Sequence, residues 1–151
     1  MITELKLYHP ETLNQILAMQ RASYKIEADL IGFYAIPPLV ETKKNLKNCG
    51  ESFFGYYIKD ILAGFISYRI DGEILGICRV AVHQDYFRMG IASALLDHVL
   101  SLFPDARKAV VSTGKKNLPA ASLYLKHGFI KTGDAEIEDN IFVTEYEKPL
   151  P

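Results

Sequence analysis

The sequence predicts a single α/β domain over residues 1–151, and three observations support this fold class. Hydrophobic residues make up 49% and charged residues 23%, which is a globular composition. Three β-favouring runs follow one another between Phe53 and Val82. Strongly helical and strand-like patterns then alternate toward the C-terminal end. A chain of this length can bury a core without disulfide bonds.

The first third of the chain predicts one strand and one helix before the pattern becomes irregular. Apolar and polar residues alternate over 2–8, as in a short strand, and Pro10 opens a helix. From 23 to 39 the helical pattern breaks down, and a short helix resumes over 39–46. The apolar side of the first helix is formed by Leu13, Ile16, Leu17 and Met19.

Three strands are predicted next, over 53–58, 61–70 and 74–82, as an antiparallel meander. The third is almost wholly apolar, as in a strand covered on both faces, so we expect the thiol of Cys78 to be buried. The remaining elements are a helix over 89–103, a strand over 108–113, a helix over 118–126, and a last pair of strands over 129–132 and 141–147 around a polar loop at 134–140.

Charge and cysteine content exclude several classes of protein. With 17 basic and 18 acidic residues the net charge is -1, so no basic field for nucleic acid is expected. The two cysteines and four scattered histidines form no redox or metal motif, so we expect no metal. No signal peptide or apolar stretch of about 20 residues is evident. The expectation is a cytoplasmic protein without membrane contact.

The first chemical signal is a strand–loop–helix junction between Val82 and the helix that follows it. Gly90 and Ala92 in the first turn keep side chains away, so an anion can approach the unpaired amides and the positive end of the helix dipole. Arg88 adds a positive charge. A pyrophosphate suits this arrangement, although an ordinary connection with small residues for packing has the same pattern.

A second motif lies about 25 residues further on, with Asn117, Leu123, Tyr124, Lys126, Gly128 and Phe129. Together with the junction at Gly90, it resembles the GNAT family of N-acetyltransferases, and the order of predicted elements is similar to that family's. The resemblance implies a mixed central sheet of about six or seven strands, with helices on both faces and strands 4 and 5 splayed to hold acyl-CoA. It also implies acetyl-CoA as co-substrate.

The resemblance further assigns site residues. It implies that the backbone of Val80, Ala81 and Val82 pairs with the pantetheine arm and that Asn117 hydrogen-bonds that arm. Tyr124 would protonate the departing thiolate as general acid, the alternative being a core aromatic on an amphipathic helix. The pyrophosphate would be held by amides of Arg88, Met89, Gly90, Ile91, Ala92 and Ser93.

Two features depart from the family pattern. Phe87 occupies the position where the signature has Gln or Arg, and Arg88 is the possible substitute one position later. No carboxylate stands near the centre of the buried strand, where many members place a general base. Glu73 at its far end, His83 in the loop, or a water molecule remain as alternatives, so the base is not assigned.

The acceptor pocket of the family is built from the segment after the first helix and the loop between the last strands. Here these are residues 24–38 and the acidic run 134–140, which suggest a cationic primary amine: a small amine, a polyamine, or a peptide or protein amino group. The alternative is that both segments are solvated loops. A non-catalytic acyl-CoA-binding sensor or regulatory module is the alternative function. A homodimer through the last strands is a further possibility. The candidate acceptor residues are Glu27, Asp29, Phe33 and Tyr34.

Overall fold

The computed structural model describes residues 1–150, with only the backbone described at Pro37 and Pro38. The strands are β1 (Ile2–Leu5), β2 (Ser52–Ile58), β3 (Ile61–Asp71), β4 (Ile74–Val82), β5 (Lys108–Gly114), β6 (Ile130–Glu138) and β7 (Ile141–Pro149). The helices are α1 (Pro10–Ile31), α2 (Pro37–Val40), α3 (Lys43–Lys47), α4 (Ile91–Leu102) and α5 (Leu118–Lys126), with a 3-10 turn η1 (Gln84–Tyr86).

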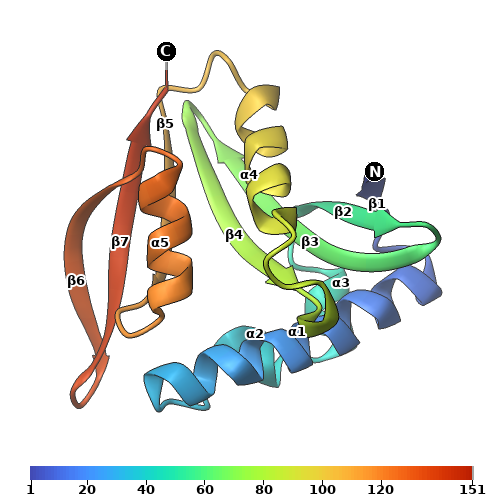
Figure 1. Cartoon of the computed structure of the whole chain (residues 1–151), viewed down its shortest axis with the longest axis horizontal. Helices are drawn as coiled ribbons and strands as arrows, with labels where there is room; N and C mark the ends of the chain where they lie inside the picture. The colour runs from blue at the N-terminus through green and yellow to red at the C-terminus, as the bar shows by residue number, and fades with distance from the viewer. Residues whose placement is uncertain (151) are drawn as a thin grey trace.

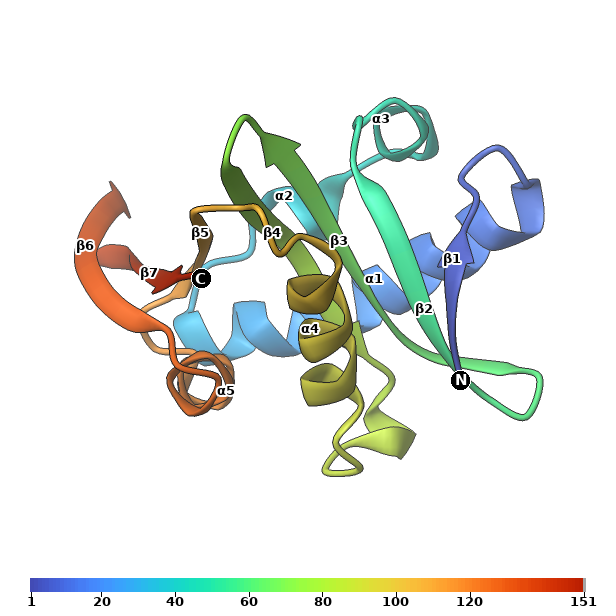
Figure 2. The same cartoon turned by 90° about the horizontal axis from the view of Figure 1, so that it is seen from above.

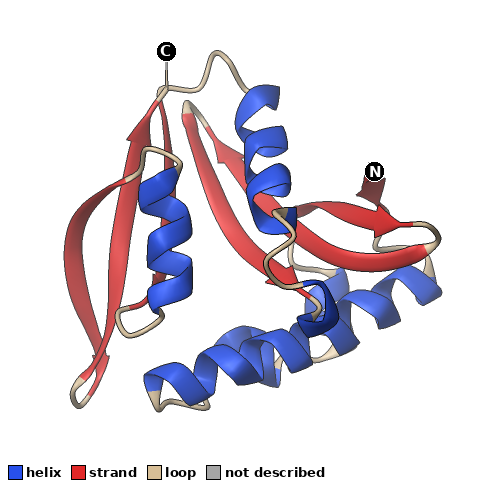
Figure 3. Cartoon of the chain, viewed as in Figure 1, coloured by secondary structure: helices blue, strands red, loops and turns tan. Residues whose placement is uncertain are grey.

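The described strands form one mixed sheet in the order β1-β2-β3-β4-β5-β7-β6 (Figure 1). Only β4 and β5 are parallel, because α4 returns the chain to the same end of the sheet; every other pair is antiparallel. Helices α1, α2 and α3 lie on one face, and α4 and α5 on the other (Figures 2 and 3). The predicted mixed α/β fold is therefore confirmed.

Apolar side chains form a core on each face of the sheet. The core beneath α4 and α5 contains Leu75 and Ile77 of β4, and the core beneath α1 contains Phe53 and Phe65. Successive side chains of a strand point to opposite faces of the sheet, so the strands contribute apolar residues to both cores, and the apolar stripes of α1 and α4 cover them. The sheet is thus covered on both sides, which explains the apolar composition of β4.

Helix α1 is longer than the sequence pattern predicts. The helix was expected to break down from Ser23, but it continues to Ile31 and ends at Gly32, whose φ of 72° suits a left-handed C-terminal cap. The amide of Gly32 donates to the carbonyl of Ala28 at 2.8 Å. Ala28 and Ile31 are buried, so tertiary packing maintains the helix where its local sequence is ambiguous.

Strand β6 also extends beyond its prediction. The polar loop expected over 134–140 was wrong, because β6 pairs with β7 as far as Glu138, opposite Ile141. Only the turn at Asp139 and Asn140 connects the two strands, and Asn140 adopts a φ of 59°. Cross-strand hydrogen bonding outweighs the low β-propensity of the acidic residues on this exposed edge strand.

A β-bulge in β4 reverses which face its side chains point to. Ser67 of β3 pairs with Arg79 and Tyr68 pairs with Ile77, so Cys78 is the extra residue. As a result Ile77 packs beneath α4, whereas Arg79 points to the α1 face and is 7% exposed. The prediction of a buried Cys78 was wrong, since this bulged residue is exposed.

Strands β4 and β5 separate soon after they meet. They pair only at Ile74–Lys108, Leu75–Ala109 and Gly76–Val110, although β4 continues along β3 to Val82 and β5 along β7 to Gly114. The expected splay between the fourth and fifth strands is confirmed. Helix α1 runs across the open end of the sheet, below the splay in Figure 1.

Candidate active site

A pocket of about 380 Å³ occupies the splay between β4 and β5. Helices α1 and α5 supply further walls, and Ile137 of β6 and Val143 of β7 lie at one side. A concave site where two strands diverge is a common place for ligand binding in α/β proteins. The polar or ionisable side chains that line it are Tyr24, Glu27, Glu41, Glu51, Cys78, Arg79, Ser112, Thr113, Asn117 and Tyr124.

Tyr124 of α5 reaches this pocket from the protein core. Its side chain is 5% exposed, and its ring packs against Phe129 and Tyr146 at centroid distances of 5.8 and 5.7 Å. Burial, followed by the nearby charge of Glu27, raises the pKa of Tyr124 well above that of a free phenol. The hydroxyl therefore keeps its proton at neutral pH and can donate a hydrogen bond into the pocket.

A chain of hydrogen bonds connects α5, β5 and α1 beside Tyr124. Asn117 caps α5, accepting from the amide of Ala120 at 3.3 Å. Its Nδ2 donates to Oγ1 of Thr113 at 3.3 Å, and Thr113 donates to Oε1 of Glu27 at 2.9 Å. Asn117, the predicted partner of the pantetheine arm, and Glu27, one of the predicted acceptor residues, thus lie close together.

Tyr24 crosses from α1 to β4 at the bulge. Its hydroxyl accepts a hydrogen bond from the amide of Val80 at 3.1 Å. Burial and the charge of Glu27 raise the pKa of Tyr24, so this hydroxyl also stays protonated. The amide of Val80, a predicted contact of the pantetheine arm, therefore faces the splay and is occupied by a side chain in this structure.

Arg79 is the centre of a buried ionic network that sequence spacing did not reveal. Its guanidinium donates five hydrogen bonds, as many as it has N–H groups, to Gln20, Glu41 and Glu51. Ser67 donates to Glu51 at 2.6 Å. Burial raises the pKa of Glu41, but hydrogen bonds from Arg79 and Gln20 outweigh this effect and lower it overall.

Cys78 lies at the edge of the same pocket. Partial desolvation, with a smaller contribution from the carboxylate of Glu51, raises the pKa of the Cys78 thiol to about 11. Less than about one part in a thousand is then thiolate at pH 7, and the thiolate is the nucleophilic form. At neutral pH the thiol therefore stays protonated, and it points to the carbonyl of Gly76 at 3.6 Å.

The strand–loop–helix junction expected before α4 is present, but α4 begins at Ile91, so Gly90 precedes its first turn instead of lying in it. Arg88 and Gly90 adopt left-handed φ values of 64° and 76°, and Gly90 is the N-cap of α4 without a side-chain capping bond. The first amides of α4 are therefore left for an anion. Phe87 and Arg88 are exposed here, and the ligand contacts of residues 88–93 stay predictions.

Ser93 in the first turn of α4 connects to the end of α5. Its hydroxyl lies 3.0 Å from Nε2 of His127, and Nδ1 of His127 lies 2.9 Å from a carboxylate oxygen of Asp97. His127 is nearly buried whereas Asp97 is exposed. These contacts join α4 and α5 on the same face of the sheet, across the splay (Figure 2), and fix the first turn of α4.

The four candidate acceptor residues do not all meet at the pocket. Glu27 lines it, but Asp29 and Tyr34 do not and instead pair with each other on the surface at 2.6 Å. Phe33 packs against Ala28, Ile31 and Ile36 and is not itself among the residues that line the pocket. Neither candidate base from the sequence lines the pocket: Glu73 is exposed at the far end of β4, and His83 is partly exposed beside η1.

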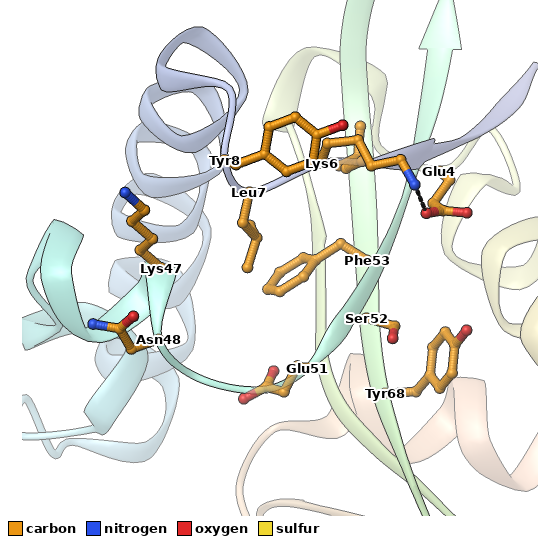
Figure 4. A pocket seen from close by; sticks show the side chains of 11 residues that line it. Glu4, Lys6, Leu7, Tyr8, Lys47, Asn48, Glu51, Ser52, Phe53 and Tyr68 are labelled. Atoms are coloured by element: carbon orange, nitrogen blue, oxygen red, sulfur yellow. Dashed lines mark hydrogen bonds and ion pairs between the residues drawn. The ribbon is translucent and has the colours of Figure 1, made fainter.

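A second pocket of about 420 Å³ lies at the β1 side of the sheet (Figure 4). It is open and is lined by side chains of both charges. Among them Lys6 pairs with Glu4, and Lys47 lines the pocket as well. Glu51 reaches this pocket as well as the one in the splay. Its tyrosines are less buried than Tyr124: Tyr8 is 67% exposed and Tyr68 is partly exposed, so the chemistry is expected in the splay.

Neither a metal site nor a membrane span is found in residues 1–150. The described histidine, cysteine, aspartate and glutamate side chains form no group of three or more that could bind a metal ion. None of the described helices combines the length and the apolar character needed to cross a bilayer.

Gly114 at the end of β5 allows α1 to pass close to the splay. A Cβ at this position would lie 2.4 Å from Cγ2 of Ile31. We expect Gly114→Ala to lower the free energy of unfolding by about 1–3 kcal/mol, measured by urea denaturation. Gly133→Ala is the control, because a Cβ there meets nothing within 4 Å. Equal stability of the two variants would contradict the close contact.

A mixed sheet splayed between two parallel strands, with an uncapped helix N-terminus beside the opening, defines the fold class of GNAT acetyltransferases. The model of the Acetyltransferase (GNAT) family matches residues 13–129. This chain belongs to that family.

Three similar proteins illustrate the relationship. UPF0157 protein YqkA of Bacillus subtilis (strain 168) is 39% identical over 142 residues, covering 93% of this chain. The chain spans 41% of that relative's length. Two solved structures share the fold. The ribosomal-protein-S18-alanine N-acetyltransferase of Escherichia coli has a TM-score of 0.80 and 16% identity, and the match covers 99% of this chain and 93% of that chain. The PaiA N-acetyltransferase of Thermoplasma acidophilum in complex with coenzyme A has a TM-score of 0.77 and 20% identity, and the match covers 99% of this chain and 98% of that chain.

Proposed function

We propose that this protein transfers an acetyl group from acetyl-CoA to a primary amine. The observation that carries the proposal is the pocket in the β4–β5 splay, which Tyr124, Asn117 and the backbone at Val80 share. Membership of an acetyltransferase family supports it. So does the similarity to two N-acetyltransferases, one of them in complex with coenzyme A.

Acetyl-CoA would enter along the splay between the helices. Backbone groups of Val80, Ala81 and Val82 would pair with the pantetheine arm, and Asn117 would hydrogen-bond it. The uncapped amides of residues 88–93 would hold the pyrophosphate at the positive end of the α4 dipole. Because the hydroxyl of Tyr24 already accepts a hydrogen bond from the amide of Val80, the pantetheine arm would replace this hydrogen bond or add to it.

Tyr124 would act as general acid. When the amine attacks the thioester carbonyl, the C–S bond breaks and negative charge develops on sulfur. Expelling a thiolate into a site with little water is unfavourable, so a phenol that remains protonated at neutral pH stabilises this step. The burial of Tyr124 supports this role, because a hydrogen bond donated to a developing thiolate is stronger in a poorly solvated site.

The charge of the pocket favours a cationic acceptor. Three lining carboxylates, Glu27, Glu41 and Glu51, face a single lining guanidinium, that of Arg79. All five N–H groups of Arg79 are already satisfied by protein oxygens, so it has no donor to spare for an anionic substrate. A small or peptidic ammonium group is therefore the proposed acceptor class.

The proposal is tested by following CoA release from acetyl-CoA with a thiol reagent. The acceptor panel should contain polyamines, aminoglycosides, amino acids and lysine peptides, with calorimetry of acetyl-CoA binding on the same sample. Turnover with one amine class is the expected result. Binding without turnover on any amine would favour a non-catalytic acyl-CoA-binding module, and absence of binding would overturn the proposed site.

A further inference from the structure

The three carboxylates of the pocket are not equivalent. Glu41 and Glu51 each contact Arg79 through both carboxylate oxygens. Their charge is compensated by the guanidinium, and taking a proton would break these charge-assisted hydrogen bonds. Glu27 has no such partner among the described ion pairs. It is the lining carboxylate whose charge the protein leaves uncompensated.

Glu27 is also held in one orientation toward the pocket. Tyr24 and Ile31, three residues before and four after it on α1, line the same pocket, so this face of the helix closes the splay. Thr113 donates to Oε1 of Glu27, and Asn117 donates to Thr113 in turn. A carboxylate fixed by one hydrogen bond keeps lone pairs for a substrate proton.

The carboxylate lies close to the reacting end of the pocket. After burial, the charge of Glu27 is the next largest cause of the raised pKa of both Tyr24 and Tyr124. Tyr124, the proposed acid for the thiolate, therefore shares its surroundings with a negative charge. An acid that holds its proton beside a carboxylate that can accept one forms a complementary pair for acyl transfer.

We propose that Glu27 is the general base that deprotonates the acceptor ammonium, an inference that rests on the acetyl transfer proposed above. The ammonium gives its first proton to Glu27, and the free amine then forms the C–N bond as the C–S bond breaks. The thiolate takes the proton of Tyr124, which is reprotonated by the second proton leaving nitrogen. Glu27 returns its proton to solvent, so the products are amide, CoA thiol and one proton.

Other groups around Glu27 do not offer a better base. The hydroxyl of Tyr24 is engaged with Val80, and the phenol of Tyr124 is the proposed acid. The pKa of the Cys78 thiol lies at about 11, so it is protonated at neutral pH. The remaining titratable or charged side chains that line the pocket are Arg79, Glu41 and Glu51.

The test compares Glu27→Gln with the wild type, using the amine that gives turnover in the panel. Glutamine keeps the shape and can still accept from Thr113, so the fold should be preserved. We expect kcat/KM at pH 7 to fall by about 10²–10³-fold, with acetyl-CoA affinity unchanged in calorimetry. The deficit should narrow as the pH approaches the pKa of the amine, because the free amine needs no base.

Two further variants make the result specific. Glu11→Gln removes an exposed carboxylate from the first turn of the same helix and should leave turnover unchanged. Thr113→Val removes the hydroxyl that orients Glu27 and should lower kcat/KM by about tenfold. If Glu27→Gln folds poorly, this second variant still tests whether Glu27 acts as the general base.

Each contrary result has its own meaning. Unchanged kcat/KM in Glu27→Gln, with an active wild type, overturns the role of Glu27 and leaves the transferase assignment intact. A deficit of the same size at every pH overturns it too, because that pattern indicates a structural role. If the wild type acetylates no amine at all, the proposed function and this inference fall together.

Discussion

Replacing Arg79 by leucine is expected to lower the free energy of unfolding by about 3–5 kcal/mol at pH 7. The substitution leaves Glu41 and Glu51 facing each other in a poorly solvated site without the guanidinium that satisfies both. Since a domain of this size is stable by about 5–15 kcal/mol, the loss is a large fraction of the total. Urea denaturation at equilibrium measures it.

The pH dependence of this loss follows from Glu41. Its pKa in the folded protein lies below the ordinary value of 4.5, so its contribution to stability is present above that pH and disappears as the pH falls through the folded pKa. In Arg79→Leu the same carboxylate gains stability by taking a proton. The difference between wild type and variant should therefore narrow below about pH 5.

Arg69→Leu is the matched control for this experiment. Arg69 also approaches Glu51, at 3.8 Å, but its side chain is 56% exposed. Because the Arg69 end of this ion pair lies largely in solvent, we expect its loss to cost about 0–1 kcal/mol. If Arg79→Leu is no more destabilising than Arg69→Leu, the buried network does not stabilise the fold as described.

Tyr124→Phe should lower kcat by about 10²–10⁴-fold while acetyl-CoA still binds. The substitution removes one hydroxyl from the pocket and keeps the ring that packs against Phe129 and Tyr146. Steady-state CoA release measures kcat, and calorimetry measures the affinity for acetyl-CoA. The expected loss belongs to the chemical step, because a phenol that donates to the leaving sulfur acts only when that sulfur becomes charged.

The control is Tyr146→Phe, which removes a neighbouring buried hydroxyl that does not line the pocket. Its kcat should remain within about twofold of the wild type, the small change expected when no contact to the reacting atoms is lost. A Tyr124→Phe variant that keeps full turnover would show that thiolate departure needs no acid from this side chain.

Much of the fold could be predicted because its signals are local. The periodicity of α4, the turn at Asp71 and Gly72, and the order of strands and helices each depend on residues close in sequence. The predictions failed where distant packing decides the outcome. The last two turns of α1 are helical because Ala28 and Ile31 are buried, and β6 is long because β7 pairs with it.

The candidate site was predictable to a similar extent. Tyr124, Asn117 and Gly90 stand in motifs, so the sequence indicates them directly. The partners of Arg79 lie 28, 38 and 59 residues away, and no spacing rule connects them. The bulge at Cys78, which turns Arg79 toward α1, is also invisible in the residue pattern of β4. Network and bulge together determine the charge of the pocket.

The short pairing between β4 and β5 has a consequence for cooperativity. Three residue pairs join the first four strands to the last three, so few backbone hydrogen bonds cross from one half of the sheet to the other. Segments connected so weakly can open as separate units, with amide exchange rates that differ on the two sides. A ligand lying in the splay would supply the missing connection and make the two halves exchange as one unit.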